Sequence, residues 1–304
     1  KNEIHANEIV LLAYYIAAIN VEATYHSIVN EGCTPFGGIL LTDTFQMYEK
    51  DDLVDVLLAD NSARRKRQRA LDIRVIVGNP PYAEGQDSAT EVKNVDYPAL
   101  DNAIMSTYGA ASSAKTRTNI YNSYIRAIRW ASERINDCGV VAFCTSASYL
   151  TATATDGVRK CLAEEFSDLY IFNLRGDART SGELRRKEKD NVFGVGSREP
   201  IAISVLVKNP KAQGQGRIFY RDIGDYLSQA EKLRIIEELG GIAGISDSNG
   251  WQKIEPDKHG DWLRQRDDSF EDFILIGSKG NGEAQAIFNL YSDGAITNRD
   301  DWIY

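Results

Sequence analysis

The sequence has few cysteines and no ordered cysteine pattern. Its 304 residues include four cysteines, and no two of them form a CxxC pair. Structural zinc sites and disulfide frameworks both require regular cysteine spacing, so this sequence excludes both and favours a reducing, cytoplasmic environment.

Long hydrophobic runs are also missing. The longest apolar stretch covers the eleven residues 9–19, which is too short to span a bilayer, and no secretory signal is visible. No GxxxxGK[ST] motif is present, so the chain carries no motor ATPase site. Membrane and secreted proteins are therefore excluded.

Positive charge is scarce for a protein that binds nucleic acid by itself. The chain has 35 Lys and Arg against 44 Asp and Glu, a net charge of −9. A self-sufficient DNA-binding domain usually has a basic surface, so contact with nucleic acid would have to use a local patch. Because the chain begins at Lys1 without methionine, we expect it to be a piece of a longer protein.

Strand-like and helix-like patterns alternate over the first two hundred residues. We expect strands at 3–7, 38–42, 73–77, 140–145, 169–174 and 201–207, and helices at 8–25, 52–69, 118–135 and 156–166. Apolar strands alternating with helices predict an α/β fold, with a mainly parallel, Rossmann-like sheet covered by helices on both faces. Such sheets bind ligands beyond the carboxyl ends of their strands.

The pattern changes after Asn209. One strand at 217–220 and one helix at 226–239 are expected, and a polar, glycine-rich region follows them. We place a boundary near 210–225. This predicts a catalytic core over 1–220 and a glycine-rich C-terminal extension over 221–304.

The strongest chemical signal is Asn79-Pro80-Pro81-Tyr82, directly after the strand expected at 73–77. The two prolines end the strand and fix the geometry of the loop. The Asn79 side chain can accept a hydrogen bond, Pro80 keeps a free carbonyl, and Tyr82 offers a flat ring for stacking. These groups suit a planar substrate that carries an amino group, although a rigid surface turn is the simpler alternative.

The segment IVGNPPY resembles motif IV of amino-methyltransferases that use S-adenosylmethionine, in the form typical of DNA adenine-N6 enzymes. In that family an acid at the end of the second strand binds the cofactor ribose, which implies Glu8. An acid or polar residue after the third strand contacts the cofactor adenine, which implies Asp43. Taken alone, Glu8 suits a helix N-terminus and Asp43 suits a cap or turn.

Nearly the whole chain is similar to the methyltransferase part of type ISP-like single-polypeptide restriction–modification enzymes. The segments that carry the likeness are 1–22, 72–82, 173–183 and 290–304. Those enzymes join a nuclease, a helicase-like translocase, a methyltransferase and a target-recognition domain. The resemblance therefore implies double-stranded DNA as substrate and these domains as partners in one polypeptide.

One feature departs from the family pattern. The glycine-rich cofactor loop that precedes the ribose-binding acid is absent, and the glycines at 194–196 and 277–282 do not lie between a strand and a helix. The resemblance thus implies an incomplete S-adenosylmethionine pocket in this chain.

Methylation of adenine N6 implies a base rotated out of the duplex, because the amine is inaccessible inside it. The resemblance assigns stacking on this base to Tyr82 and Phe193, while a core or loop position is an equal alternative for Phe193. Four arginines suit phosphate contacts or, alternatively, surface ion pairs: Arg175, Arg179, Arg185 and Arg186.

The motif alone leaves other acceptors open, namely cytosine N4, RNA and protein glutamine. A non-catalytic scaffold that links a motor to a DNA-reading domain is a further alternative. Cytosine-C5 methylation is excluded, because it needs a nucleophilic cysteine after a proline and no proline here precedes one.

Overall fold

The computed structural model describes residues 3–29, 35–49, 59–82, 97–114, 118–194, 196–267, 269, 272–277 and 286–288. The chain divides into two compact units, Lys1–Arg264 and Gln265–Tyr304. In the second unit, β9 (Leu275–Gly277) pairs in parallel with β10 (Ala286–Phe288). Part of the helix expected at 52–69, the glycines at 278–282 and the family-like segment 290–304 lie outside the described residues.

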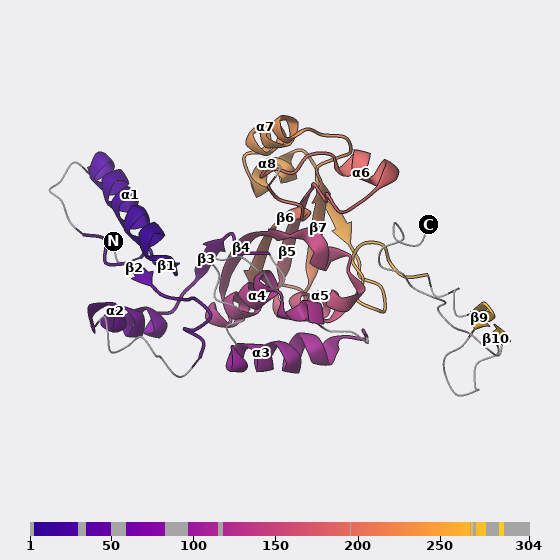
Figure 1. The fold of residues 1–304 in the computed structure, drawn as a ribbon, viewed down its shortest axis with the longest axis horizontal. Coiled ribbons are helices and arrows are strands. Elements are labelled where there is room, and N and C mark those ends of the chain that lie inside the picture. Colours follow the sequence, from indigo (N-terminus) through magenta and orange to yellow (C-terminus); the bar gives the residue numbers. More distant parts are fainter. Residues whose placement is uncertain are drawn as a thin grey trace, which may run out of the picture. The chain divides into compact units, whose positions relative to one another are not determined.

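The first unit is built around a six-stranded sheet (Figure 1). Its strands are, in spatial order, β3 (Val75–Gly78), β4 (Gly139–Ser146), β6 (Ile201–Lys208), β5 (Asp168–Arg175), β7 (Arg217–Asp222) and β8 (Gln252–Ile254). The predicted α/β class is confirmed, and every strand expected between 73 and 220 is present.

The expectation of a mainly parallel sheet was wrong. β3 with β4 and β5 with β7 are parallel, but β6 runs antiparallel to both β4 and β5, and β8 runs antiparallel to β7. The apolar run of β6 indicates burial on both faces of the sheet, but it does not indicate the direction in which the strand runs. The sheet is therefore mixed.

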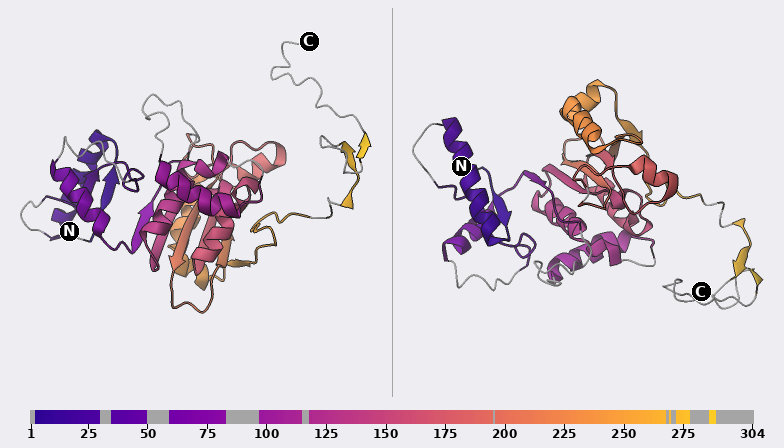
Figure 2. Two further views of the ribbon diagram at one scale, coloured as in Figure 1. Left: turned by 90° about the horizontal axis from the view of Figure 1, so that it is seen from below. Right: turned by 45° about the horizontal axis from the view of Figure 1, so that its top comes forward.

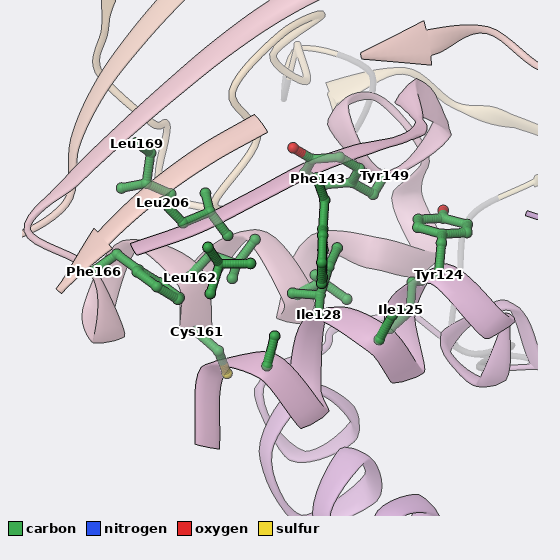
Figure 3. Close-up of a cluster of buried hydrophobic side chains, with 14 of the residues drawn as sticks. Tyr124, Ile125, Ile128, Phe143, Tyr149, Cys161, Leu162, Phe166, Leu169 and Leu206 are labelled. Carbon is green, nitrogen blue, oxygen red and sulfur yellow. The ribbon is translucent and has the colours of Figure 1, made fainter. Parts of the chain in front are cut away.

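Helices cover both faces of this sheet (Figure 2). One face packs against α3 (Pro98–Ile104), a π-helical turn η1 (Met105–Gly109), α4 (Ser123–Arg134) and α5 (Asp156–Glu165), and the other against α7 (Gln229–Leu239) and α8 (Ile242–Asp247). Along β5, Leu169 and Ile171 enter the first core while Phe172 and Leu174 enter the second, as the two-residue period of a strand requires. Figure 3 shows the first core between α4, α5 and the sheet.

Shorter helices connect these elements. They are η2 (Thr118–Tyr121), η3 (Ala147–Leu150), η4 (Thr153–Thr155) and α6 (Gly182–Glu188). The helix expected at 118–135 is split into η2 and α4, because Asn122 has an extended backbone with ψ 141° and begins α4 as its N-cap residue.

The N-terminal part of this unit forms a separate parallel sheet of β1 (Ala6–Glu8) and β2 (Ile39–Leu41). Its helices are α1 (Leu11–Val29) and α2 (Ala59–Ala70). Asn61 in α2 exchanges two hydrogen bonds with the Leu41 backbone, at 2.9 and 3.1 Å, which fixes α2 on β2. Among the described residues, no helix combines the length and apolar character needed to cross a membrane.

Candidate active site

The carboxyl ends of four strands, β3, β4, β5 and β7, lie at one edge of the six-stranded sheet. β3 and β4 are parallel, and β5 runs in the same direction as β4 because both are antiparallel to β6. The start of β6 lies at the same edge, since Ile201 pairs with Ser146 and with Arg175. The segments after β3, β4 and β5 and the segment before β6 are therefore neighbours.

The Asn79–Tyr82 motif lies at this edge, directly after β3. Asn79 is exposed, whereas the Tyr82 ring packs against both cores of the sheet. The Tyr82 hydroxyl donates a hydrogen bond to the Asn79 side-chain oxygen. Burial, reinforced by the neighbouring Cys144 thiol, raises the pKa of the Tyr82 phenol to about 12. The ring is therefore uncharged at neutral pH.

A cavity of about 840 Å³ opens beside the motif. Pro81 and Tyr82 form one part of its wall. The remaining lining residues are Asn119, Asn122, Tyr124, Ser146, Ser148, Ala152, Thr155, Arg179 and Gly196–Glu199. Pockets that hold small ligands have volumes of about 300–1,000 Å³, so this cavity can enclose a nucleobase with its sugar.

The polar wall of the cavity is organised around Glu199. Its carboxylate accepts hydrogen bonds from the Ser146 hydroxyl at 3.0 Å and from the Arg179 guanidinium at 2.6 Å. Arg179 also contacts Asp177 at 3.0 Å and donates to the Ser148 hydroxyl at 3.2 Å. These bonds orient the side chains before any ligand arrives.

The four arginines proposed for phosphate contacts all have partners within the chain. Arg175 pairs with Asp222 at 2.7 Å and also with Asp225. Arg186 lies 3.3 Å from Glu183, Arg185 donates to the carbonyl of Lys189, and Arg179 has the contacts given above. Three of the four therefore form ion pairs within the chain, and Arg185 bonds to a backbone carbonyl.

A buried lysine holds the segment that carries these arginines. The Lys232 ammonium, on α7, donates to the carbonyls of Leu174, Glu188 and Asp190 at 2.9, 3.1 and 2.7 Å. Burial lowers its pKa to about 8. The lysine ties the end of β5 and the residues at 188–190 to α7, so the segment between them, which carries Arg179, is held at both ends.

The acids expected to bind the cofactor lie on the smaller sheet. Glu8 ends β1 and pairs with Leu41, and Asp43 follows β2. The Glu8 carboxylate accepts from the Val10 backbone at 2.8 Å. The Asp43 carboxylate accepts from the Phe45 backbone at 2.8 Å and from the Tyr97 hydroxyl at 2.7 Å. The structure thus brings these two acids to adjacent strand ends.

Phe193 lies in the segment between α6 and β6, three residues before Gly196 of the cavity wall. Its side chain is 50% exposed and is outside the set that lines the cavity. Its backbone is fixed by a 2.9 Å hydrogen bond to the Asn191 side chain.

Sequence reasoning missed several polar residues of the cavity wall. Ser146 and Ser148 follow a predicted strand, so the strand-end rule could have identified them. Glu199 precedes a strand, and it reaches the same edge only because β6 is antiparallel. Asn119 lies in η2 and Asn122 is the N-cap residue of α4, and neither carries a local signal of a binding role.

Comparisons with known proteins identify close structural relatives for nearly the whole chain. A nuclease-deletion mutant of the type ISP restriction–modification enzyme LlaGI, in complex with a DNA substrate mimic, is 45% identical over 94% of this chain with a TM-score of 0.85. The ATP-dependent type ISP enzyme LlaBIII bound to DNA is 40% identical over 98% with a TM-score of 0.88. The DrdV–DNA complex is 36% identical over 99% with a TM-score of 0.87.

The chain spans only part of each relative, namely 23% of the LlaGI chain, 20% of the LlaBIII chain and 30% of the DrdV chain. No protein-family model matches the sequence, and no curated protein matches it either. The resemblance that the sequence motifs predicted is confirmed by the solved structures.

Proposed function

Because the chain belongs to the family of type ISP-like restriction–modification enzymes, we propose that it is the methyltransferase region of such an enzyme. The proposed reaction moves a methyl group from S-adenosylmethionine to N6 of adenine in DNA. The observation that carries the proposal is the Asn79–Tyr82 motif at the carboxyl end of β3, whose Pro81 and Tyr82 line an 840 Å³ cavity and whose Asn79 and Pro80 directly precede them.

The chain activates the target amine by hydrogen bonding. The lone pair of the adenine N6 amine is delocalised into the ring, so the amine is a poor nucleophile. Hydrogen bonds from its hydrogens to the Asn79 oxygen and the Pro80 carbonyl draw the nitrogen towards tetrahedral geometry and stabilise the developing positive charge. The Asn79 oxygen has two lone pairs, so it can accept an amine hydrogen beside the Tyr82 hydroxyl.

The cavity receives the rotated base. Tyr82 provides an uncharged ring on its wall, and Pro81 lies next to it. We assign stacking on the base to Tyr82 and assign Phe193, half exposed near the cavity, to its second face. Holding the amine in line with the methyl donor supplies the proximity contribution to the rate.

S-adenosylmethionine supplies an electrophilic methyl group on a sulfonium centre. Glu8 and Asp43 suit this cofactor, because carboxylates accept hydrogen bonds from ribose hydroxyls and from the adenine amine. Each carboxylate has about four acceptor sites, so Asp43 retains capacity beyond its bonds to Phe45 and Tyr97.

We propose double-stranded DNA with a flipped adenine as the substrate. The relatives were solved with DNA or a DNA mimic, which supports this assignment. We further propose that translocase, nuclease and target-recognition domains of the same polypeptide are the partners, with a catalytic core over 1–220 and an extension over 221–304 that leads toward the target-recognition domain.

The test is methyl transfer to duplex DNA by the full-length protein with Asn79→Ala. Loss of one preorganised hydrogen-bonding group in an active site typically lowers kcat by about 10²–10³-fold, and we expect a loss of that size. The control is Asn209→Ala, because Asn209 follows β6 at the opposite edge of the sheet.

Unchanged activity of the Asn79 variant would contradict the catalytic assignment and favour a scaffold. Nucleoside analysis of the product identifies the acceptor. N6-methyladenine is expected, whereas N4-methylcytosine, or transfer only to RNA or protein, would overturn the adenine assignment.

A further inference from the structure

Arg159, on α5, is fully buried and binds the wall of the cavity from behind. Its guanidinium donates to the carbonyls of Tyr149 and Ala152, both at 2.8 Å, and to the Thr155 hydroxyl at 3.2 Å. Ala152 and Thr155 line the cavity. One buried cation therefore holds the segment from Tyr149 to Thr155.

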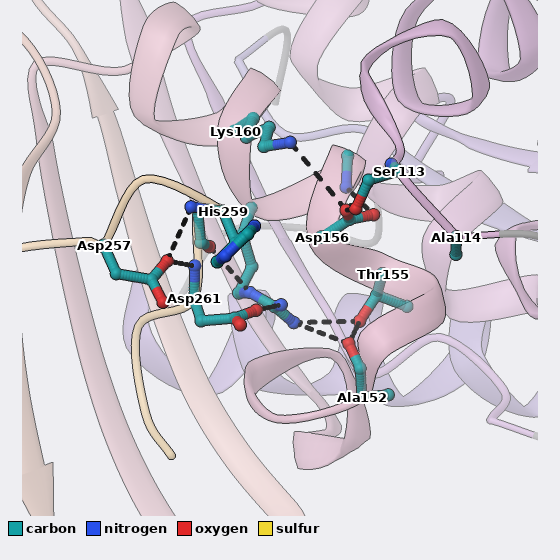
Figure 4. Close-up of polar contacts among 12 residues, drawn as sticks. Ser113, Ala114, Ala152, Thr155, Asp156, Lys160, Asp257, His259 and Asp261 are labelled. Carbon is teal, nitrogen blue, oxygen red and sulfur yellow. Dashed lines mark hydrogen bonds and ion pairs between the residues drawn. The ribbon is translucent and has the colours of Figure 1, made fainter. Parts of the chain in front are cut away.

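The charge of Arg159 is balanced by Asp261, which is 4% exposed. The guanidinium also donates to the Gly260 carbonyl at 3.0 Å. Figure 4 shows Asp261, Ala152 and Thr155 within one cluster of polar contacts, drawn as dashed lines. Residues about one hundred positions apart in the sequence thus share one buried polar cluster.

The turn that carries Asp261 is closed by its own hydrogen bonds. The Asp257 carboxylate accepts from the backbone of His259 at 2.9 Å and of Asp261 at 2.8 Å. Gly260 has φ +79°, a conformation that few side chains tolerate, and its N–H donates to the Asp257 carbonyl at 3.0 Å. Asp261 is consequently presented to Arg159 in a fixed orientation.

An aromatic contact accompanies the ion pair. The Trp262 ring lies edge-on to Tyr149, with 6.2 Å between ring centroids, and Tyr149 lies 6.4 Å from Tyr124 of the cavity wall. The Tyr149 hydroxyl shares a 2.7 Å hydrogen bond with Ser204 of β6. The turn at 257–262 therefore contacts the wall through apolar packing as well as charge.

The hydrogen bonds from Arg159 matter because the wall segment has little regular secondary structure of its own. The segment between β4 and α5 contains only the short 3₁₀ turns η3 and η4. Such turns leave carbonyls without helical partners, and buried carbonyls need a donor. Arg159 supplies a donor to the carbonyls of Tyr149 and Ala152, in addition to the Thr155 hydroxyl, which donates to them at 3.0 and 2.9 Å.

We propose that Arg159 and Asp261 are positioning residues for base binding. Through them, the turn at 257–261 fixes the shape of the cavity wall, although neither residue contacts the base. The inference rests on the proposed function, because it takes the cavity to be the site of the flipped adenine. It makes the segment just before residue 265 part of the support of the active site.

The experiment uses the full-length protein with Asp261→Asn and, as a matched control, Glu165→Gln. Glu165 forms another ion pair, with the buried Arg129 at 2.5 Å; Glu165 itself is partly exposed, and the pair lies between α4 and α5, outside the cavity wall. Misplaced positioning groups commonly cost one to two powers of ten, so we expect the KM for DNA to rise about tenfold or more in the Asp261 variant, with kcat within about twofold. The Glu165 variant should lower Tm and leave KM unchanged.

Arg159→Lys provides a second variant in case loss of the carboxylate prevents folding. Lysine keeps the charge beside Asp261 but has no planar fork to span the two carbonyls, so KM should again rise. Equal KM values for wild type, Arg159→Lys and Asp261→Asn would overturn the proposal.

Hydrogen exchange separates this inference from the proposed function. Amides of 147–155 should exchange faster in the Asp261 and Arg159 variants than in wild type and the Glu165 variant. If the wild type transfers no methyl group, the proposed function fails, and this readout still tests the coupling. Unchanged exchange rates of these amides in both variants would then refute the coupling between the turn and the cavity wall.

Discussion

Asp156 is completely buried at the start of α5, and its carboxylate joins α5 to Ser112 and Ser113, which follow the π-helical turn η1. It accepts from the Ser112 and Ser113 hydroxyls, each at 2.5 Å, and from the backbone of Ser113 and Gly157 at 2.9 and 2.8 Å. Burial alone would raise the pKa of this group. The four hydrogen bonds outweigh burial and lower the pKa to about 2.

The lowered pKa of Asp156 predicts that the protein loses stability in acid. The folded-state pKa is below the unfolded value, so the unfolded state binds more protons and stability falls as pH drops from about 4 to 2. Asp156→Asn should lower the free energy of unfolding by about 2 kcal/mol at pH 7 and remove most of that pH dependence. Chemical denaturation across this pH range is the measurement, and an equal acid slope in both proteins would contradict the assignment.

Single residues differ in how far the sequence predicts them. Asn79, Pro80, Pro81 and Tyr82 are contiguous, so their chemistry can be identified without knowing the fold. Glu199 becomes part of the cavity through strand topology and through its partners Ser146 and Arg179, which are distant in sequence. A contiguous motif can thus be proposed as a site from the sequence alone, whereas residues that only the fold brings together cannot.

At the scale of elements, α7 shows how a helix start is encoded locally. Ser228 and Glu231 form a capping box, in which the Ser228 N–H donates to the Glu231 carboxylate at 2.8 Å and the Glu231 N–H to the Ser228 hydroxyl at 3.4 Å. Gly240, with φ +62°, begins the left-handed C-terminal cap. Both ends of α7 are thus set by side chains or glycine.

Ser228→Ala should reduce the free energy of unfolding by about 1 kcal/mol, the usual cost of losing an N-cap side chain. Ser181→Ala is the matched control, because Ser181 is the N-cap residue of α6 but makes no side-chain capping bond. Denaturation curves of the two variants test the difference. Equal midpoints would show that the capping box contributes nothing measurable.

The apolar pattern predicted where strands occur but not how they run. The strands at 140–145, 169–174 and 201–207 were all found within a residue of their expected limits. Direction is decided by connections and neighbours, and the segment between β5 and β6 returns the chain antiparallel beside β5. The break at Asn122 between η2 and α4 could not be predicted from the sequence either, since the apolar stripe continues across it.

At the scale of the whole molecule, the candidate active site lies in a chain whose net charge is unfavourable for binding DNA. The candidate cavity and the Asn79–Tyr82 motif lie in a chain with a net charge of −9. Phosphate contacts dominate non-specific affinity for DNA, so a chain of this charge gains little from them. Tight DNA binding by the 304 residues alone is therefore not expected.

We also predict that the 304-residue chain binds the cofactor weakly, because few contacts to it are available. In our proposal Glu8 and Asp43 contact ribose and adenine, and residues 1–7 of this chain contain no glycine that could approach the methionine part of the cofactor. Hydrogen bonds to charged groups contribute about 1.5–3 kcal/mol each, so the loss of a few weakens binding by several powers of ten. Titration calorimetry of S-adenosylmethionine into the chain should give a dissociation constant far above micromolar, and Asp43→Ala should weaken the binding further. Micromolar affinity that disappears in the Asp43 variant would instead mean that these two acids and their neighbours suffice for the cofactor.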